Sequence, residues 1–246
     1  MIRYTSWNKD SSPFLRKLIA SLKDTDSIVT FNWDTLIDQE LEAANTKISK
    51  ALLDGLAKSA NPDRGAVVED NSIRIKQLHS GSFLKVHGGI NLTHCTSLNC
   101  YRHESPYVWR SSEETPAYWQ CGECGSSTQE TILSPHGAKT YASGRFFRHQ
   151  ANLAAEKLSI ASKIVVIGYS FPVFDIEARS MLRCSRLDDN DSEAWLSEVS
   201  IVDPKTVQKS HISPIVNLLG LDNIHAHGHK VNLKLYKSVD EYMAAI

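Results

Sequence analysis

The sequence has no excess of charge of either sign and no long apolar run. Its 27 lysine and arginine residues against 28 aspartate and glutamate residues give a formal net charge of −1. This balance gives no electrostatic reason to expect nucleic acid or an anionic membrane as the main partner. No apolar stretch reaches the length of a membrane span, and residues 1–6 carry no signal-peptide pattern. We therefore expect a cytoplasmic globular protein without membrane association.

Cysteine is scarce, and four of the five cysteines stand in two spaced pairs. Cys95 and Cys100 form the first pair, and Cys121 and Cys124 form the second, twenty residues further along. Four thiolates fill the tetrahedral shell that Zn²⁺ prefers in structural sites, and the Cys-Gly-Glu-Cys-Gly turn of the second pair suits a zinc knuckle. The alternatives are two disulfides or unconnected buried thiols, but nothing in the sequence indicates the oxidising compartment that disulfides need. The pattern predicts a structural zinc site and leaves Cys184 as a buried core thiol.

Outside the cysteine segment, apolar residues recur in short blocks typical of alternating helices and strands. Helices are expected at 13–22, 36–44, 146–160 and 175–187, with a closing helix capped by Ser238, and strands at 27–31, 82–86, 163–167 and 199–202. Residues 58–72 are polar and predict an exposed loop. Strands that alternate with helices predict an α/β fold, in which a parallel sheet is covered by helices on both faces.

Four of the predicted strands end in polar or glycine-rich turns. These turns are Asn32-Trp33-Asp34, His87-Gly88, Gly168-Tyr169-Ser170 and Asp203. The carboxyl ends of parallel strands lie along one rim of a sheet, and ligands of such sheets bind there. We therefore expect all four turns to project onto one site.

Each turn has a functional and a structural interpretation. His87, followed by two glycines, is expected to face a cleft and act as a general base, or it merely caps its strand. Asn32 and Asp34 supply an amide and a carboxylate for an amide-bearing ring or a ribose, or they form an Asx turn before the next helix. The turn at Gly168 would bring backbone N–H groups to phosphate oxygens. Asp203 would bind a ribose, or it forms a simple turn.

The order of these motifs resembles the sirtuin superfamily, and more closely its sirtuin-like branch in bacterial proteins, often found in phage defence. Thr30-Phe31-Asn32-Trp33-Asp34 is similar to the Thr-Gln-Asn-x-Asp motif of the family, in the Thr-Phe-Asn-aromatic-Asp form of the branch. Phe83-Leu84-Lys85-Val86-His87-Gly88 is similar to the segment with the catalytic histidine of the family. Ile167-Gly168-Tyr169-Ser170-Phe171-Pro172 is similar to the Gly-Tyr-Ser-Leu-Pro turn of the branch. The resemblance spans about residues 27–205 and includes the two cysteine pairs.

This resemblance implies an enzyme that breaks the N-glycosidic bond of NAD⁺ and releases nicotinamide and ADP-ribose. It implies a Rossmann-like sheet over residues 1–92 and 131–246, with a zinc-ribbon insert at 93–130. His87 would be the general base, Asn32 would hold the nicotinamide ribose or the attacking water, and Asp34 would contact the nicotinamide carboxamide. The cofactor-binding positions implied by the resemblance are Thr30, Phe31, Gly168, Tyr169, Ser170 on the adenosine side, and Asp203 at the adenine ribose.

Two departures from the family pattern leave other interpretations open. The Phe-Gly-Glu segment that binds acyl-lysine peptides in deacylating sirtuins is replaced by Ile132-Leu133-Ser134-Pro135-His136-Gly137, which favours water over a deacylase reaction. The Gly-Ala-Gly-x-Ser loop that cradles the NAD⁺ diphosphate, and the strand before it, have no counterpart ahead of Ser12. Besides the NAD⁺ hydrolase, two hypotheses therefore stay open: an NAD⁺-dependent protein deacylase, and a non-catalytic nucleotide- or partner-binding module or domain fragment that lacks this loop. Because a sheet without its central strand exposes unpaired edges, we expect the isolated chain to be unstable, to form oligomers or to pair with a defence-system partner protein.

Overall fold

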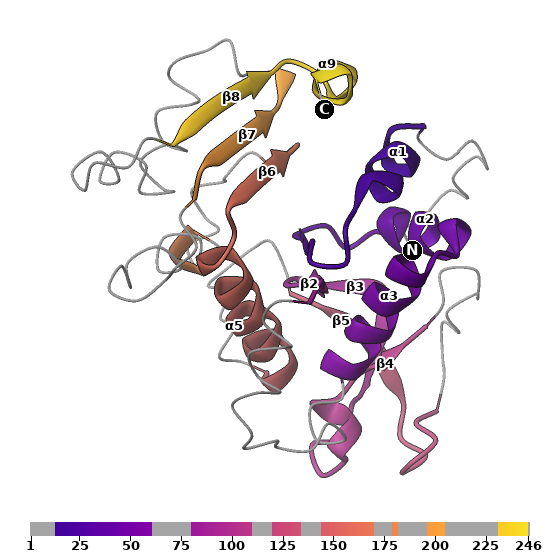
Figure 1. The fold of residues 1–246 in the computed structure, drawn as a ribbon. Helices are drawn as coiled ribbons and strands as arrows, with labels where there is room; N and C mark the ends of the chain where they lie inside the picture. Colours follow the sequence, from indigo (N-terminus) through magenta and orange to yellow (C-terminus); the bar gives the residue numbers. More distant parts are fainter. Residues whose placement is uncertain are drawn as a thin grey trace.

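The computed structural model describes residues 13–60, 80–109, 120–133, 144–169, 179–181, 196–204 and 231–245 of the chain. Helices and strands lie near most of the predicted positions in these residues (Figure 1), and the structure adds a helix at 47–59 and a strand at 232–236 that the sequence did not predict. The helices are α1 (Pro13–Ser21), α2 (Leu36–Ala44), α3 (Lys47–Ser59), the short 3₁₀ helix η1 (Tyr101–His103), α5 (Arg145–Ser159) and α9 (Val239–Ala245). The strands are β1 (Ile28–Thr30), β2 (Phe83–Lys85), β3 (Gly88–Cys95), β4 (Tyr107–Val108), β5 (Thr128–Ile132), β6 (Lys163–Ile167), β7 (Glu198–Val202) and β8 (Asn232–Tyr236).

The described strands form three sheets. β1 and β2 pair in parallel, with Val29 opposite Leu84. β6, β7 and β8 form a second parallel sheet in that order, with Val165 opposite Ser200. β3 pairs antiparallel with β4 on one side and β5 on the other. The chain is therefore a mixed α/β protein with parallel sheets, which confirms the predicted fold class.

The expected single parallel sheet is interrupted between β1 and β6 in the described part of the chain. The carbonyl of Thr30 accepts the N–H of Val86 at 3.2 Å, so the backbone groups of Val29 point to the edge of β1 away from β2. Gly168 donates its N–H to the carbonyl of Val202 at 3.1 Å, and by the same alternation the odd-numbered residues of β6 face away from β7. No described strand pairs with either edge.

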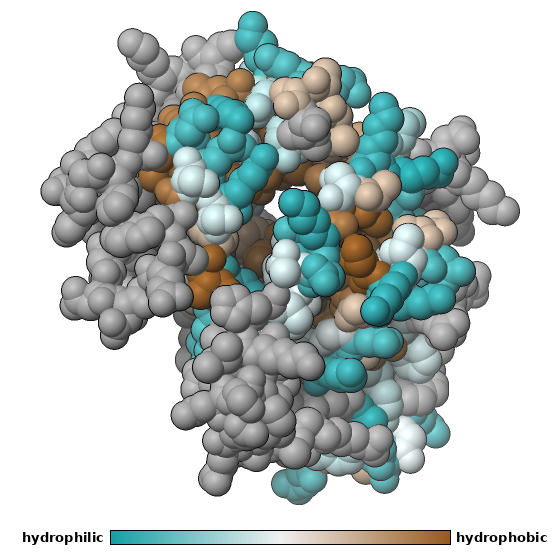
Figure 2. Space-filling view, viewed as in Figure 1, coloured by the Kyte–Doolittle hydropathy of each residue, from teal (hydrophilic) through white to brown (hydrophobic). Residues whose placement is uncertain are grey.

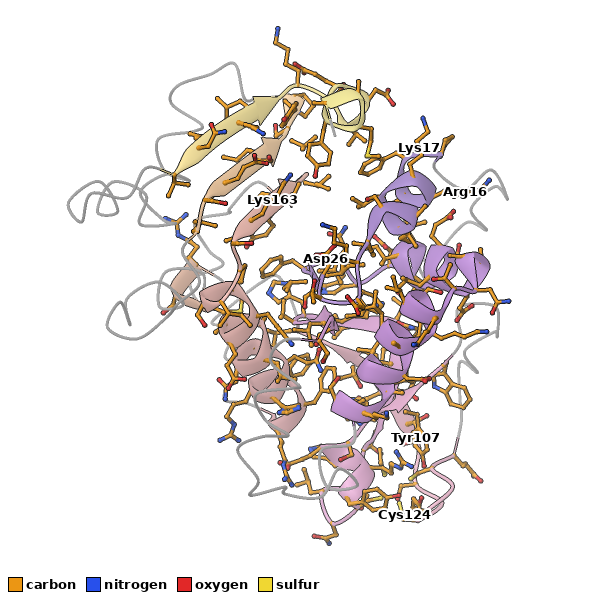
Figure 3. All side chains as sticks on the ribbon, viewed as in Figure 1. Arg16, Lys17, Asp26, Tyr107, Cys124 and Lys163 are labelled. Carbon is orange, nitrogen blue, oxygen red and sulfur yellow. The ribbon has the colours of Figure 1, made fainter. Side chains whose placement is uncertain are left out.

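The space between these two edges is visible as a hollow with apolar side chains along its wall (Figure 2). Asp26, just before β1, and Lys163, at the start of β6, lie on its two sides (Figure 3). At one end of the hollow, α9 contacts α1 (Figure 1). The two parallel sheets are thus held in one molecule by helices and side chains, without hydrogen bonds between β1 and β6.

Helices cover both faces of β2, because alternate residues of a strand point to opposite sides. Phe83 packs into a buried cluster with residues of α1, α2 and α3, namely Ile19, Leu41, Leu52 and Leu56. Leu84 belongs to a second buried cluster, with Ala151 and Ala154 of α5, Ile164 of β6 and Ile201 of β7. α5 therefore joins the β6–β8 sheet to β2, and the two-sided cover predicted for the sheet is confirmed at this strand.

Local sequence signals explain where several elements begin and end. Ser238 accepts the N–H of Glu241 at 3.2 Å and caps α9, as predicted. The loop expected from residue 58 begins later, because α3 extends to Ser59, whose buried hydroxyl accepts a hydrogen bond from Gln150 of α5 at 2.7 Å. The rest of that loop, most of the helix expected at 175–187 and Cys184 lie outside the described residues. None of the described helices is long and apolar enough to cross a membrane.

Candidate functional site

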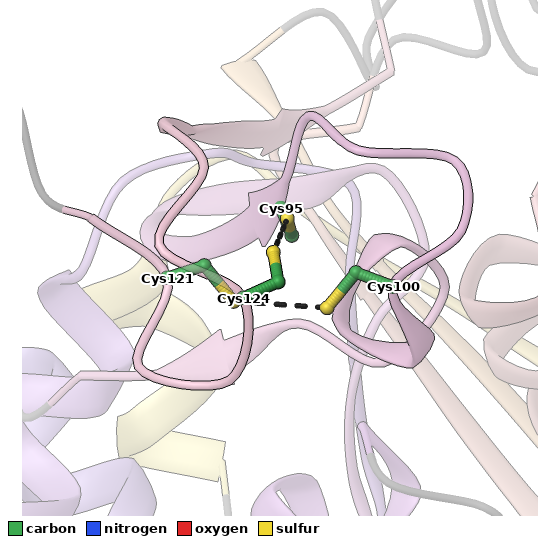
Figure 4. A group of neighbouring side chains, drawn as sticks. All are labelled: Cys95, Cys100, Cys121 and Cys124. Carbon is green, nitrogen blue, oxygen red and sulfur yellow. Dashed lines mark hydrogen bonds between the residues drawn. The ribbon is translucent and has the colours of Figure 1, made fainter.

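The four paired cysteines converge at one point (Figure 4). Their sulfur atoms all lie within 4.8 Å of one another, with Cys95 and Cys124 at 3.4 Å and Cys100 and Cys121 at 3.7 Å. None of these described cysteines forms a disulfide. A tetrahedral Zn²⁺ with Zn–S bonds of about 2.3 Å places its sulfurs ~3.8 Å apart, so the donor set and its spacing fit a structural zinc ion.

Backbone hydrogen bonds shape the turn that carries the second cysteine pair. Cys121 donates its N–H to the carbonyl of Ser126 at 2.7 Å, and Gly125 donates to the carbonyl of Cys121 at 2.8 Å. Gly125 has φ +73°, in the left-handed region that favours glycine. The glycine after the second cysteine is therefore required by the turn itself, which agrees with the predicted zinc knuckle.

The thiols of the cluster differ in their tendency to ionise. Burial raises the pKa of Cys95 to about 12 and also raises the pKa of Cys100. Burial opposes ionisation of Cys121 too, but hydrogen bonds from Tyr107 and from backbone N–H groups outweigh it and lower the pKa of this thiol to about 6. Hydrogen bonds from Ser126 lower the pKa of Cys124. Each close sulfur pair thus joins a thiol with a raised pKa to a thiol with a lowered pKa, and a divalent cation would favour loss of the protons of all four.

Aromatic and cationic side chains surround the cysteine cluster. The hydroxyl of Tyr107 lies 3.5 Å from the sulfur of Cys121. Tyr107 and Cys124 are labelled close together at the bottom of Figure 3. The guanidinium of Arg102 lies 4.2 Å from the ring centre of Tyr107 and 5.0 Å from that of Tyr101. Four thiolates around Zn²⁺ carry a net charge of −2, so a cation at this position is electrostatically favourable.

The ends of three parallel strands meet in a cluster of rings. Phe31 follows β1, His87 follows β2 and Tyr169 follows β6. The rings of Phe31 and Tyr169 are stacked, with centroids 4.4 Å apart and an interplanar angle of 15°. The edge-to-face contact of Phe31 and His87 has centroids 5.2 Å apart. These contacts bring three of the predicted turns together across the interruption between β1 and β6.

His87 is buried and only 3% exposed, whereas the sequence predicts a histidine facing a cleft. β3 begins at Gly88, so His87 stands in a tight connection between two strands. Its carbonyl accepts the N–H of Leu133 at 3.0 Å, and Phe31 packs against its ring. Gly88 has φ +73°, and a Cβ there would lie 1.9 Å from the carbonyl oxygen of Thr131. The first glycine after the histidine is therefore needed for the approach of β5.

Asn32 and Asp34 lie in an exposed turn between β1 and α2. The backbone N–H of Asn32 donates to the hydroxyl of Thr30 at 3.1 Å, and its side-chain amide has no partner among the described residues. Asp34 accepts the N–H of Leu36 through Oδ1 at 3.1 Å, which is the Asx turn of its structural interpretation. Trp33 between them has a buried indole N–H without a hydrogen-bond partner in the described part of the chain.

The remaining predicted positions lie at the ends of β6 and β7. Gly168 has φ +62°, again in the left-handed region. Asp203 directly follows β7, and its N–H donates to the carbonyl of Tyr236 at 3.0 Å. Ser170 lies outside the described residues. Gly168 and Asp203 thus stand at the same end of neighbouring strands, as the sequence predicts for a shared rim.

A buried polar network that the sequence patterns did not predict lies beside these turns. Lys85, Asp38 and Asn91 are at most 2% exposed and are hydrogen-bonded to one another. Lys85 falls two residues before His87, and Asn91 falls four residues after it. The one available signal was a lysine inside an otherwise apolar strand, because buried charges are rarely found without partners.

No protein-family model matches the chain, and no curated protein sequence matches it. Among solved structures, a Sir2 homologue in complex with NAD aligns with 94% of this chain at 14% identity and a TM-score of 0.46. A mutant Sir2 homologue with 2′-O-acetyl ADP-ribose aligns with 96% at 14% identity and a TM-score of 0.45. A mutant with ADP-ribose aligns with 95% at 16% identity and a TM-score of 0.40. The alignments cover 61%, 64% and 94% of those chains, so this chain spans less than two thirds of the length of the first two.

Proposed function

We propose that this protein cleaves the N-glycosidic bond of NAD⁺ and releases nicotinamide and ADP-ribose. The observation that supports the proposal best is the meeting of three strand ends, where Phe31 contacts both His87 and Tyr169. Asn32 and Asp34 are exposed directly beside this cluster. A buried imidazole next to an exposed amide and a carboxylate supplies a base and two orienting groups at one place.

The proposed reaction is hydrolysis without any redox change. A water oxygen forms a bond to C1′ of the nicotinamide ribose while the bond from C1′ to the pyridinium nitrogen breaks, and neutral nicotinamide leaves. His87 accepts the proton of the water, and Asn32 orients that water or the ribose hydroxyls through its amide. The Asx turn fixes Asp34 through Oδ1, which leaves Oδ2 to accept a hydrogen bond from the nicotinamide carboxamide. Asp203 and the turn at Gly168 are proposed to hold the adenosine side.

We also propose that zinc in the cysteine cluster has a structural role only. It would cross-link β3, the segment before η1 and the turn before β5, and so stabilise the insert at 93–130. Residues 1–92 and 131–246 would form the NAD⁺-binding part. The cluster supplies four thiolates to the metal and no open coordination position for a substrate.

The test is release of nicotinamide from NAD⁺ by zinc-loaded, folded protein. His87→Ala and Asn32→Ala are each expected to abolish release. Asn232→Ala is the matched control, because Asn232 is also an exposed asparagine but stands at the start of β8, at the opposite end of the strands. NAD⁺ that survives prolonged incubation with the folded protein would refute the proposal.

The same assay separates the other two hypotheses. Formation of O-acyl-ADP-ribose from an acyl-lysine peptide would establish a deacylase instead. Binding of ADP-ribose without any nicotinamide release would establish a nucleotide-binding module. Loss of release in Asn232→Ala as well as in Asn32→Ala would show that the effect is not specific to the strand ends. A role in phage defence is a further part of the proposal, and loss of cellular NAD⁺ only during phage infection is its expected sign.

A further inference from the structure

The ammonium of Lys85 lies at the centre of a closed hydrogen-bond network. Lys85 is fully buried, and its Nζ donates to Oδ2 of Asp38, Oδ1 of Asn91 and the carbonyl oxygen of Asp34, each at 2.9 Å. An ammonium has three N–H donors, so these three bonds use them all. A buried charge with a carboxylate partner and no free donor is tolerated in a protein interior.

The partners of Lys85 are also bonded to one another and to the cysteine module. Asn91 donates from Nδ2 to Oδ1 of Asp38 at 2.9 Å and to the carbonyl of Trp109 at 3.3 Å. Trp109 donates its backbone N–H to the carbonyl of Asn91 at 2.9 Å and its indole N–H to Thr93 at 2.8 Å. The ammonium and the carboxylate therefore connect the turn after β1, helix α2, strand β2 and strand β3, and Asn91 extends this network to the segment after β4.

Two of these segments carry the proposed reacting groups. Asp34 accepts from Lys85 through its backbone carbonyl, which leaves its carboxylate for other contacts. His87 follows Lys85 by two residues along the same short strand and turn. The bond between Lys85 and Asp34 thus links the exposed turn to the strand that precedes His87. A backbone bond from Ile90 N–H to the carbonyl of Trp33, at 2.9 Å, joins the same turn to β3, the strand after His87.

We propose that Lys85 is a positioning residue that sets the place of Asn32 and Asp34 relative to His87. This inference rests on the proposed function of those residues. Displacing groups that must align with a substrate by about 1 Å lowers the rate by roughly 10²-fold. Removal of the ammonium frees the carbonyl of Asp34 and leaves the carboxylate of Asp38 without its charged partner, so the turn loses one of the bonds that fix its position.

Gly89 provides a way to displace the ammonium without removing it. A Cβ on Gly89 would lie 2.8 Å from both Cε and Nζ of Lys85 and 3.0 Å from Oδ1 of Asn91. These atoms are the ends of side chains and are able to shift, in contrast to the backbone carbonyl that Gly88 faces. Gly89→Ala therefore keeps every charged group of the network and is expected to displace the ammonium of Lys85.

The first readout is kinetic. In the nicotinamide-release assay, Lys85→Met and Gly89→Ala are expected to lower kcat at least about tenfold, with a smaller change in KM. The control is Lys157→Met, which removes a buried lysine whose Nζ donates to the carbonyl of Ser80 at 2.6 Å, outside the network. Lys157→Met is expected to keep kcat within about twofold, even where its urea midpoint falls as far as that of Lys85→Met. Unchanged kcat in a folded Lys85→Met or Gly89→Ala protein would overturn the inference.

The second readout does not depend on catalysis. Backbone amide resonances of residues 32–34 and of His87 are expected to shift together in Gly89→Ala, while those of β7 and β8 stay in place. Failure of the unsubstituted protein to release nicotinamide would refute the proposed function, and the resonances would still decide the positioning role. If the turn and His87 keep their resonances in folded Gly89→Ala and Lys85→Met proteins, Lys85 does not position them.

Discussion

Replacing Gly88 by alanine is expected to lower the free energy of unfolding through two effects, backbone strain and a steric clash with β5. Gly88 has φ +73°, and an L-residue in the left-handed region costs about 1–2 kcal/mol. The added Cβ would also lie 1.9 Å from the carbonyl oxygen and 2.8 Å from the carbonyl carbon of Thr131. That carbonyl belongs to β5, where Thr131 pairs with Gly89 of β3, so it moves only if the strand moves. Overpacking of this kind adds about 1–3 kcal/mol, and the expected total loss is about 2–5 kcal/mol.

Gly125→Ala is the matched control, because Gly125 has the same φ of +73° but no atom within 4 Å of the place that a Cβ would take. Its loss of stability is expected to come from the backbone strain alone, about 1–2 kcal/mol. Gly55→Ala, in the interior of α3 with open space around it, is expected to gain about 0.5–1 kcal/mol, because alanine is the better helix former. Unfolding free energies from urea titration at saturating zinc measure all three. A Gly88→Ala loss no greater than that of Gly125→Ala would refute the close approach of β5 to the turn after His87.

Three further predictions concern other parts of the molecule. A chelator under reducing conditions is expected to release one zinc per chain. The amide resonances of β4 and η1 are then expected to lose their dispersion, while those of β6–β8 keep theirs. Absence of zinc in freshly purified protein would contradict this prediction. Hydrogen bonds from Lys163 and Lys234 lower the pKa of Glu198 to about 2, so the ion pairs stabilise the fold above pH ~4.5 and lose this effect as the pH falls towards 2. Because the two lysine side chains are 42% and 41% exposed, Glu198→Gln is expected to cost only about 1–2 kcal/mol at pH 7, with the difference from wild type shrinking in titrations below pH 4.5. No described strand pairs with the outer edges of β1 and β6, which predicts self-association in light scattering at micromolar concentration, and a cooperatively melting monomer would count against it.

The elements that the sequence predicts well are those whose signal lies within a few residues. The strand at Ile28–Thr30 was found from its apolar run, and the helix that begins at Pro13 was found from apolar spacing together with its Ser-Pro start. The cysteine cluster was found from spacing too, since metal ligands must be close in space and short turns bring them there. The cap of α9 was found because serine is a favoured N-cap residue, and Ser238 accepts the N–H of Glu241 in the structure.

The features that were missed depend on residues far apart in the sequence. The burial of His87 comes from Phe31 and from the strand that begins at Gly88, and no local pattern distinguishes a covered histidine from one that faces a cleft. The interruption of the parallel sheet between β1 and β6 likewise depends on which strands become neighbours, which apolar spacing does not encode.

Lys85 shows how such a feature could still be inferred. A lysine inside a three-residue strand whose neighbours are apolar requires a carboxylate partner if both faces of the strand are covered. The helix that follows β1 carries carboxylates, and the structure shows that Asp38 among them pairs with Lys85. Glycine is also required at position 89, because a Cβ there would occupy the space of the Lys85 ammonium. The second glycine after the histidine is therefore explained by the lysine before it, and substitution at either position should disturb the same turn.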